Sequence, residues 1–330
     1  MTTVDVHAHV LLRDVEQAVA GRPELDAQRA LDLRRNGAES TAVSGRMVGD
    51  RLARLTDVTV RLADMDAAGV DVQIVSPSPS HYHYWAEPEL AGRVYRLANE
   101  GTAGHCAEAP GRLHGLGLVP LQHAGMAVQA LDHALDLGLK GVEISSHAPG
   151  RELSDPALEP FWARAAERGA VLFLHPFGCT LDERLDRWYL SNIVGQPTEN
   201  AVALSHLIFS GVLDRHPGLK IVAAHGGGYL PTHIGRADHG WHARPDTKGC
   251  AEPPSSYLRR LWFDSLVHDP GVLRHLVSVA GAGQVLLGSD HPFDMGSDDP
   301  LGDLRAAGLA PDDVDAIGGA NAVALFSLKD

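Results

Sequence analysis

The stretch VLFLHP at residues 171–176 places four apolar residues directly before a histidine and a proline. Two later stretches have the same design: KIVAAHGGG at 220–228 ends its apolar run at His225, and VLLGSDHPF at 285–293 places Asp290 just after its run. Short apolar runs of this kind are typical of strands buried in a parallel sheet. Each run therefore ends at a side chain that can bind a metal or carry a proton.

Similar runs recur along the whole chain and alternate with stretches of helical length. They occupy residues 3–6, 70–75, 116–119, 141–144, 171–174, 220–223, 261–263 and 285–287. Strands that alternate with helices predict parallel βαβ units, and eight such units close a (β/α)8 barrel of the TIM type. We therefore expect an α/β fold with a single domain over residues 1–330.

Start and stop signals define several helices between these strands. Residues 57–68 carry apolar positions at helical spacing and are followed by Gly69. Residues 155–168 open with an aspartate and a proline and stop before Gly169, as helices commonly do. A third helix is expected at residues 198–213, before the breaker HPG at 216–218.

Two segments break the alternation. Residues 10–55 are charged and contain no clear strand, so we expect an insertion after the first strand that covers the barrel mouth and is not a separate domain. Residues 229–260 carry four prolines and no strand pattern, which predicts a second long loop. Long loops on a barrel are usually binding or interaction elements.

The composition restricts the partners of the protein. A formal net charge of −14 argues against nucleic acid or an anionic membrane as the main partner. Three cysteines, an odd number without a CxxC pair, argue against a disulfide framework. The N-terminal MTTVDVHAHV lacks the apolar core of a secretory signal, and no stretch approaches the ~20 apolar residues of a membrane span. These features predict a soluble cytoplasmic protein.

The first run leads into DVHAH at residues 5–9, where two histidines are spaced two residues apart. Side chains two apart on a strand point the same way, so His7 and His9 can reach one ion. Taken alone, the pair fits two solvent-facing histidines equally well. In a barrel, however, all strands end on one face, where His175 and Asp290 would join the pair.

These four side chains predict one divalent cation per chain. Imidazole and carboxylate suit Zn2+, which we favour, and also Mn2+ or Fe2+. Three neutral histidines and one aspartate leave the ion with net positive charge, so an open position can bind water or substrate. His225 adds a base beside the ligands, which a structural or non-enzymatic metal site would not need.

Further motifs accompany these residues. They are LGLVPLQ at 116–122, HP at 175–176, HGGG at 225–228, GRADHG at 235–240, LVHDP at 266–270 and GSDHPF at 288–293. Together with the HxH pair, this pattern resembles the amidohydrolase superfamily and, within it, the aminocarboxymuconate-semialdehyde decarboxylase branch. No single motif would identify that family, but the combination is specific and extends from near residue 1 to about residue 325.

The resemblance implies roles for individual residues. The metal ligands of the family match His7, His9, His175 and Asp290. His225 matches the catalytic histidine, which activates the metal-bound water. The fourth strand reads VEIS at 142–145 and has no lysine to bridge two metals, since Lys140 precedes it. The resemblance therefore favours a mononuclear site.

The same resemblance implies a homodimer. Arg236 and Arg244 match arginines that follow the sixth strand. In the family, the first of these reaches the active site of the neighbouring subunit and binds the substrate carboxylate. Two surface arginines on an acidic protein explain the residues equally well.

The substrate side of the pocket departs from the family pattern. The family's insertion arginine, which pairs with the substrate carboxylate, falls at Gly49 in an ungapped alignment, so Arg46 or Arg51 would have to replace it. A family tryptophan after the fifth strand is replaced near Asn192. Trp85, after the second strand, is a candidate wall of the pocket, although packing alone also explains an aromatic there.

These observations predict a metal-dependent, non-oxidative decarboxylase that acts on a small unsaturated or aromatic carboxylic acid. His225 and Asp290 would move protons, and the glycines at 226–228 would leave room for substrate. Asp264, after the seventh strand, would either orient a ligand or make a structural hydrogen bond. A hydrolase or hydratase that uses the same metal-bound water is the alternative.

Overall fold

The apolar runs form the parallel strands of a barrel in the computed structural model, which describes residues 2–328. Its strands are β1 (Val4–Val10), β2 (Val72–Pro77), β3 (Leu113–Gly115), β4 (Gly117–Leu118), β5 (Gly141–Ile144), β8 (Val171–Leu174), β9 (Lys220–Ala223), β10 (Trp262–Asp264) and β11 (Val285–Leu286). Three strands match the predicted bounds, and most of the others are shifted by one or two residues. β1 is longer than predicted, so the HxH pair lies inside the strand and not at its end.

Hydrogen bonds join the strands into a circle. Neighbouring strands are hydrogen-bonded in the orders β1-β2-β3 and β11-β10-β9-β8-β5-β4. β3 and β4 are halves of one strand, interrupted at Leu116, whose N–H donates to the carbonyl of Val75 at 2.9 Å. On the other side, the N–H of Val6 donates to Leu287 at 2.9 Å, and that of Asp290 donates to His7 at 2.8 Å. The predicted (β/α)8 barrel is confirmed.

Side chains alternate between two cores, as the two-residue period of a strand requires. Val142, Ile144 and Leu172 lie in the core between the strands and the outer helices. Val171 and Phe173 lie in a second core inside the barrel, together with residues of the C-terminal helix α15 (Asn321–Phe326). Because Phe173 faces inward, His175 two residues later faces inward as well.

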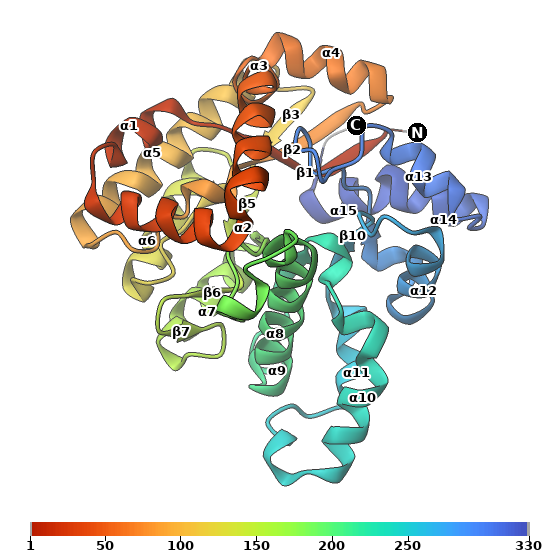
Figure 1. The fold of residues 1–330 in the computed structure, drawn as a ribbon. Coiled ribbons are helices and arrows are strands. Elements are labelled where there is room, and N and C mark those ends of the chain that lie inside the picture. Colours follow the sequence, from red (N-terminus) through yellow and green to blue (C-terminus); the bar gives the residue numbers. More distant parts are fainter. Residues whose placement is uncertain (1, 329–330) are drawn as a thin grey trace.

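Helices surround the strands (Figure 1). They are α4 (Val58–Ala68), α5 (Pro88–Ala107), α6 (Ala124–Asp136), α7 (Glu159–Arg168), α8 (Gln196–Phe209), α9 (Val212–Arg215), α12 (Pro270–Ala280), α13 (Pro300–Ala306) and α14 (Pro311–Asp315). α4 begins where predicted, since the Asp57 carboxylate caps it by accepting from the N–H of Thr59 at 2.8 Å. The third predicted helix is divided at Gly211, which has a left-handed φ of 73°. β5 is followed by a small hairpin of β6 (His147–Ala148) and β7 (Arg151–Glu152).

The segment after β1 is helical and consists of α1 (Arg13–Val19), α2 (Pro23–Asp50) and α3 (Leu52–Thr56). α2 bends at Gly37, which has φ 77° and ψ 159°. Its residues contact the segment after β8: Arg34 pairs with Asp186 at 3.2 Å, and the hydroxyl of Ser191 donates to Asn36 at 2.6 Å. Because β1 and β8 lie on opposite sides of the barrel, α2 crosses the mouth.

The prediction of an irregular loop at residues 229–260 was wrong. This segment contains α10 (Leu230–Ala243) and α11 (Pro254–Tyr257), and the two helices extend away from the barrel (Figure 1). Glycines and prolines hid the helix in the sequence, but Pro231 lies in the first turn, where its missing N–H costs nothing. Burial of Leu230 and Ile234 then stabilises α10. Among residues 2–328, no helix is long and apolar enough to cross a membrane.

Candidate metal centre

His7 and His9 present their Nε2 atoms to the same point inside the barrel. Both side chains are fully buried, and the two Nε2 atoms are 3.2 Å apart. The register of the pairing between β1 and β2 shifts between Asp5 and Ala8, in the part of β1 where the histidines lie. The predicted convergence of the pair on one point is therefore present in the structure.

Asp290 completes a set of closely spaced donor atoms. Its Oδ1 lies 3.3 Å from Nε2 of His7 and 3.1 Å from Nε2 of His9. Two ligands that bind one Zn2+ at about 2.0–2.1 Å in a tetrahedral arrangement lie about 3.3 Å apart. The three atoms thus have the spacing of ligands that share an ion.

His175 faces the same point from β8. Its ring centroid is 5.0 Å from those of both His7 and His9, and neither of its buried ring nitrogens has a hydrogen-bond partner within residues 2–328. In the same part of the chain, Oδ1 of Asp290 likewise lacks a hydrogen-bond donor. Buried polar atoms without partners are costly, and a cation between them would satisfy both. The residues therefore fit a metal ion.

His225 lies at the edge of this cluster. Its side chain is 21% exposed, and its Nε2 is 3.9 Å from Oδ2 of Asp290. Polar side-chain atoms of His7, His175, His225 and Asp290 that could bind a metal all lie within 4.8 Å of one another. Both His225 and Asp290 have a left-handed backbone, with φ of 53° and 59°, which is uncommon for residues other than glycine and often marks functional sites.

The glycines after His225 serve the turn and not the substrate. A Cβ at Gly226 would lie 2.4 Å from the side chain of Val267, and one at Gly228 would lie 2.0 Å from the carbonyl oxygen of Pro197. The prediction that these glycines leave room for substrate was wrong, because protein atoms already fill that space. Their positive φ values and close packing hold His225 in place.

Asp264, at the end of β10, orients His7. Its Oδ2 accepts from Nδ1 of His7 at 2.6 Å and from the N–H of His225 at 2.9 Å, while its Oδ1 accepts from the N–H of Gly226 at 2.8 Å. The bond to Nδ1 fixes the tautomer of His7 that leaves Nε2 free to bind a metal. Asp264 therefore orients a candidate ligand and also makes structural hydrogen bonds, so the structure contains both alternatives.

The cluster carries an excess of negative charge. Burial lowers the pKa of His7, but the carboxylates of Asp290 and Asp264 outweigh burial and raise that pKa to about 10. Burial and the neighbouring His225 hold the pKa of His175 well below its usual value, so its imidazole is neutral. Without a cation, the cluster takes up a proton on His7, and a divalent cation would replace that proton.

Glu143 is a buried carboxyl group to which the sequence analysis gave no role. It is fully buried on β5 opposite Phe173, and neither carboxyl oxygen has a hydrogen-bond partner among residues 2–328. The nearby hydroxyl of Tyr82 instead donates to the carbonyl of His175 at 2.8 Å. Burial raises the pKa of Glu143 to about 8. Strand alternation, which points residue 143 inward, was the signal that could have identified it.

The predicted substrate-binding residues are not gathered at the metal centre of a single chain. Arg51 lies beside the turn that carries Asp290, since its Nη1 donates to the carbonyl of Pro292 at 2.6 Å. Arg46 is exposed on α2, and Arg236 is exposed on α10. Trp85 packs edge-on against His83 with 5.4 Å between ring centroids, and its buried Nε1 has no hydrogen-bond partner in the described part of the chain.

A parallel barrel with a histidine–aspartate cluster at the carboxyl ends of its strands defines a class, the barrel enzymes with an internal metal centre. Residues 4–328 match the sequence profile of the amidohydrolase family, and the chain belongs to that family. It is 34% identical over 296 residues to the 2-amino-3-carboxymuconate-6-semialdehyde decarboxylase of Dictyostelium discoideum, covering 89% of this chain and 82% of that protein. The same enzyme of Caenorhabditis elegans is 30% identical over 356 residues, covering 92% and 86%.

Solved structures agree with this assignment. The 5-carboxyvanillate decarboxylase of Sphingomonas paucimobilis superimposes with a TM-score of 0.82 at 27% identity and covers 99% of both chains. That of Novosphingobium aromaticivorans, complexed with manganese, has a TM-score of 0.87 at 22% identity and covers 99% of this chain and 96% of its own. The predicted decarboxylase branch and carboxy-lyase class are confirmed, and the hydrolase alternative is disfavoured.

We expect Asp264→Asn to weaken metal binding by about 10- to 100-fold, because loss of the carboxylate removes the charge that orients His7 and raises its basicity. Affinity would be measured by competition with a coloured chelator. Asp269→Asn is a matched control in the same loop, because Asp269 only caps α12, and asparagine caps equally well. Equal affinities of both variants and the wild type would contradict the role of Asp264.

The raised pKa of Glu143 predicts a pH dependence of stability in the metal-free protein. The folded state retains this proton up to about pH 8, whereas the unfolded chain loses it near pH 4.5. Glu143 should therefore contribute a fall of a few kcal/mol in the free energy of unfolding as pH rises through this window, beside the separate contributions of the buried histidines. Urea unfolding from pH 5 to 8 should show that Glu143→Gln removes most of this fall.

Glu199→Gln is the control for this pH measurement. The pKa of Glu199 is lowered to about 2, because bonds from His147 and Thr180 outweigh the effect of burial. The stabilisation that ionised Glu199 gives the fold is present above pH 4.5 and is lost as pH falls through about 2. Glu199→Gln should therefore leave the slope of the free energy of unfolding between pH 5 and 8 unchanged. An unaltered slope in Glu143→Gln would show that Glu143 is ionised in the folded protein.

Proposed function

We propose that this protein removes CO2, without oxidation, from a small unsaturated or aromatic carboxylic acid, with one divalent cation held by His7, His9, His175 and Asp290. The observation that carries the proposal is the 3.1–3.3 Å spacing of donor atoms from β1 and from the turn after β11, with the unpartnered ring of His175 beside them. Membership in a branch whose curated relatives are decarboxylases supports the reaction type.

The donor set suits Zn2+, which we favour, and Mn2+ as the alternative. When bound, such a cation polarises a substrate oxygen and stabilises the negative charge that develops as CO2 leaves. The bond between the carboxyl carbon and the rest of the substrate breaks, and the carbon that remains takes a proton from the protein. Asp290 and His225, whose facing atoms are 3.9 Å apart, are the proposed carriers of that proton.

We propose that an arginine binds the substrate carboxylate, because a guanidinium binds a carboxylate through paired hydrogen bonds. Arg51 is the candidate within the chain, since it already lies beside the turn that carries Asp290. Arg46 is the second candidate within the insertion. Trp85 is proposed as an apolar wall after β2.

Arg236 is proposed to act across a homodimer. It is exposed on α10, which extends away from its own barrel, and none of the ion pairs among residues 2–328 involves it. An arginine placed in this way is available to a neighbouring subunit. The three cysteines are free and buried, which suits the cytoplasm, where we place the protein.

The reaction is tested with carboxyl-labelled substrates. Metal-loaded protein is incubated with a panel of hydroxybenzoates and unsaturated amino dicarboxylic acids, beside lactones and amides. At least one labelled acid should release labelled CO2, and His175→Ala, which loses a metal ligand, should not release it. Turnover of lactones or amides, with the label always retained in the product, would contradict decarboxylation.

The roles of His225 and Arg236 are tested by complementation. His225→Ala should keep its metal and lose ~10²–10⁴ in turnover, as the loss of an acid–base group usually does. Mixed with Arg236→Ala it should regain activity, because one of the two sites in a mixed dimer is then intact. A mixture of His225→Ala with His175→Ala is the control and should stay inactive. Loss of metal from His225→Ala would make His225 a ligand, and failure to complement would contradict the shared site.

A further inference from the structure

Arg61 is a buried cation without a carboxylate among its hydrogen-bond partners. It lies on α4 and is 0% exposed. Its Nε donates to Nε2 of His105 at 3.1 Å, its Nη1 donates to Oε1 of Gln73 at 2.6 Å, and its Nη2 donates to the carbonyl of His9 at 2.5 Å. Buried arginines are rare unless they are paired, so the position of this charge needs a reason.

The Gln73 side chain connects Arg61 to a buried carboxylate. Gln73 lies on β2 and is 2% exposed, and its Nε2 donates to Oδ2 of Asp5 at 2.9 Å. The amide therefore accepts from the cation at one end and donates to the anion at the other. Arg61 and Asp5 form a charge pair with one amide between them, and each stays hydrogen-bonded inside the protein.

The remaining bonds of Asp5 end on β1 and on the turn after β11, which together carry three of the four proposed metal ligands. Its Oδ1 accepts from the N–H of His7 at 3.1 Å and from the N–H of Ser289 at 3.0 Å, and its Oδ2 accepts from the Ser289 hydroxyl at 2.6 Å. Ser289 directly precedes Asp290. One carboxylate thus ties β1 to the turn after β11 at the level of the ligands, while Arg61 holds the carbonyl of His9 directly.

A second link joins Arg61 to the same turn. Nδ1 of His291 lies 3.4 Å from Nη1 of Arg61, and Nε2 of His291 lies 3.1 Å from Oδ2 of Asp64. Asp64 is on α4, one turn after Arg61. α4 is therefore connected to both sequence neighbours of Asp290. It contacts His291 directly, and it is linked to Ser289 through Gln73 and Asp5.

We propose that Arg61, acting through Gln73 and Asp5, is a positioning residue for the metal centre. The network fixes the backbone on which His7, His9 and Asp290 are mounted, and thereby holds their donor atoms 3.1–3.3 Å apart before the ion arrives. A centre whose ligands are already in position binds its metal more tightly, because fewer side chains have to become ordered when the ion binds. This inference rests on the metal centre proposed above.

The test compares metal affinities of folded, metal-free variants by chelator competition with Zn2+ and Mn2+. Arg61→Met and Gln73→Leu should each weaken binding by about 10- to 100-fold, the range expected when groups behind metal ligands are lost. Arg61→Lys keeps the charge but cannot reach three acceptors, and should lie between Arg61→Met and the wild type. Cobalt-loaded Arg61→Met should also show altered visible absorption, which reports the ligand geometry.

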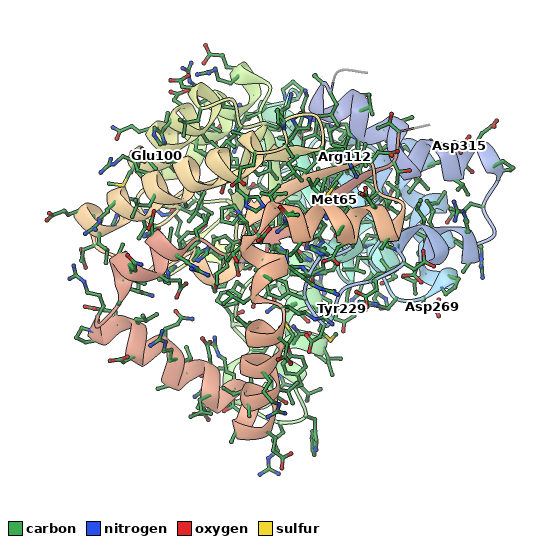
Figure 2. The ribbon with its side chains drawn as sticks, turned by 90° about the horizontal axis from the view of Figure 1, so that it is seen from above. Met65, Glu100, Arg112, Tyr229, Asp269 and Asp315 are labelled. Atoms are coloured by element: carbon green, nitrogen blue, oxygen red, sulfur yellow. The ribbon has the colours of Figure 1, made fainter. Side chains whose placement is uncertain are left out.

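Arg112→Met is the matched control. Arg112 also joins α4 to the β2 region, through Asp66 at 2.8 Å and the carbonyl of Val70 at 3.0 Å, but at the opposite end of the strand. Figure 2 labels Arg112 together with Met65 of α4. Its loss should lower the melting temperature and leave the metal affinity within about twofold of the wild type, because ligand geometry, and not helix attachment, sets affinity.

The outcomes separate this inference from the proposed function. Wild-type affinity and cobalt spectrum in Arg61→Met and Gln73→Leu would overturn the positioning role alone. A wild-type protein that binds neither metal would overturn the metal centre as well. If Arg61→Met does not fold, as judged by circular dichroism, Gln73→Leu decides the question, because it removes the bridge and leaves Arg61 in place.

Discussion

The hydrogen bond between Asp264 and Nδ1 of His7 is the contact on which the candidate site depends. It fixes which nitrogen of His7 faces the cluster, and the same carboxylate holds the backbone of His225 and Gly226. One side chain at the end of β10 thereby orders a residue inside β1 and two residues that follow β9. This is possible because parallel strands in a barrel all end on one face.

Charge balance explains why so many ionisable groups can be buried together. Asp264 and Asp290 stay ionised, and their negative charge is offset by a proton on His7 or by a cation in its place. Glu143, just below, is held neutral by burial and adds no further negative charge. The Arg61–Gln73–Asp5 network keeps its own opposite charges in contact through an amide, so the region behind the ligands is balanced as well.

The parts of the molecule that are proposed to meet a substrate are less buried than the candidate centre. Among the 28 residues of α2, Leu25 alone is buried, and the helix is tied to the far side of the mouth by polar contacts such as Arg34 with Asp186. α10 likewise extends beyond the barrel and carries an exposed Arg236. In barrel enzymes, differences in the peripheral segments usually change the substrate, while the residues at the strand ends retain the chemistry.

The sequence by itself determined the barrel and predicted a set of candidate metal ligands, because strand periodicity and the polar residues that accompany each run are local features. His7, His9, His175 and Asp290 could be named from their spacing after apolar runs. His225 was also visible at the end of its run, and the family pattern gave it a catalytic role.

Only the tertiary structure decided the rest. The contact of Asp264 with His7 joins residues 257 positions apart, and the isolation of Glu143 depends on where the Tyr82 hydroxyl points. The helix α10 was hidden because glycine and proline have low helix propensity, which tertiary burial of Leu230 and Ile234 overrides. Local sequence encodes which way a side chain faces on its strand, but its partner depends on how distant segments pack.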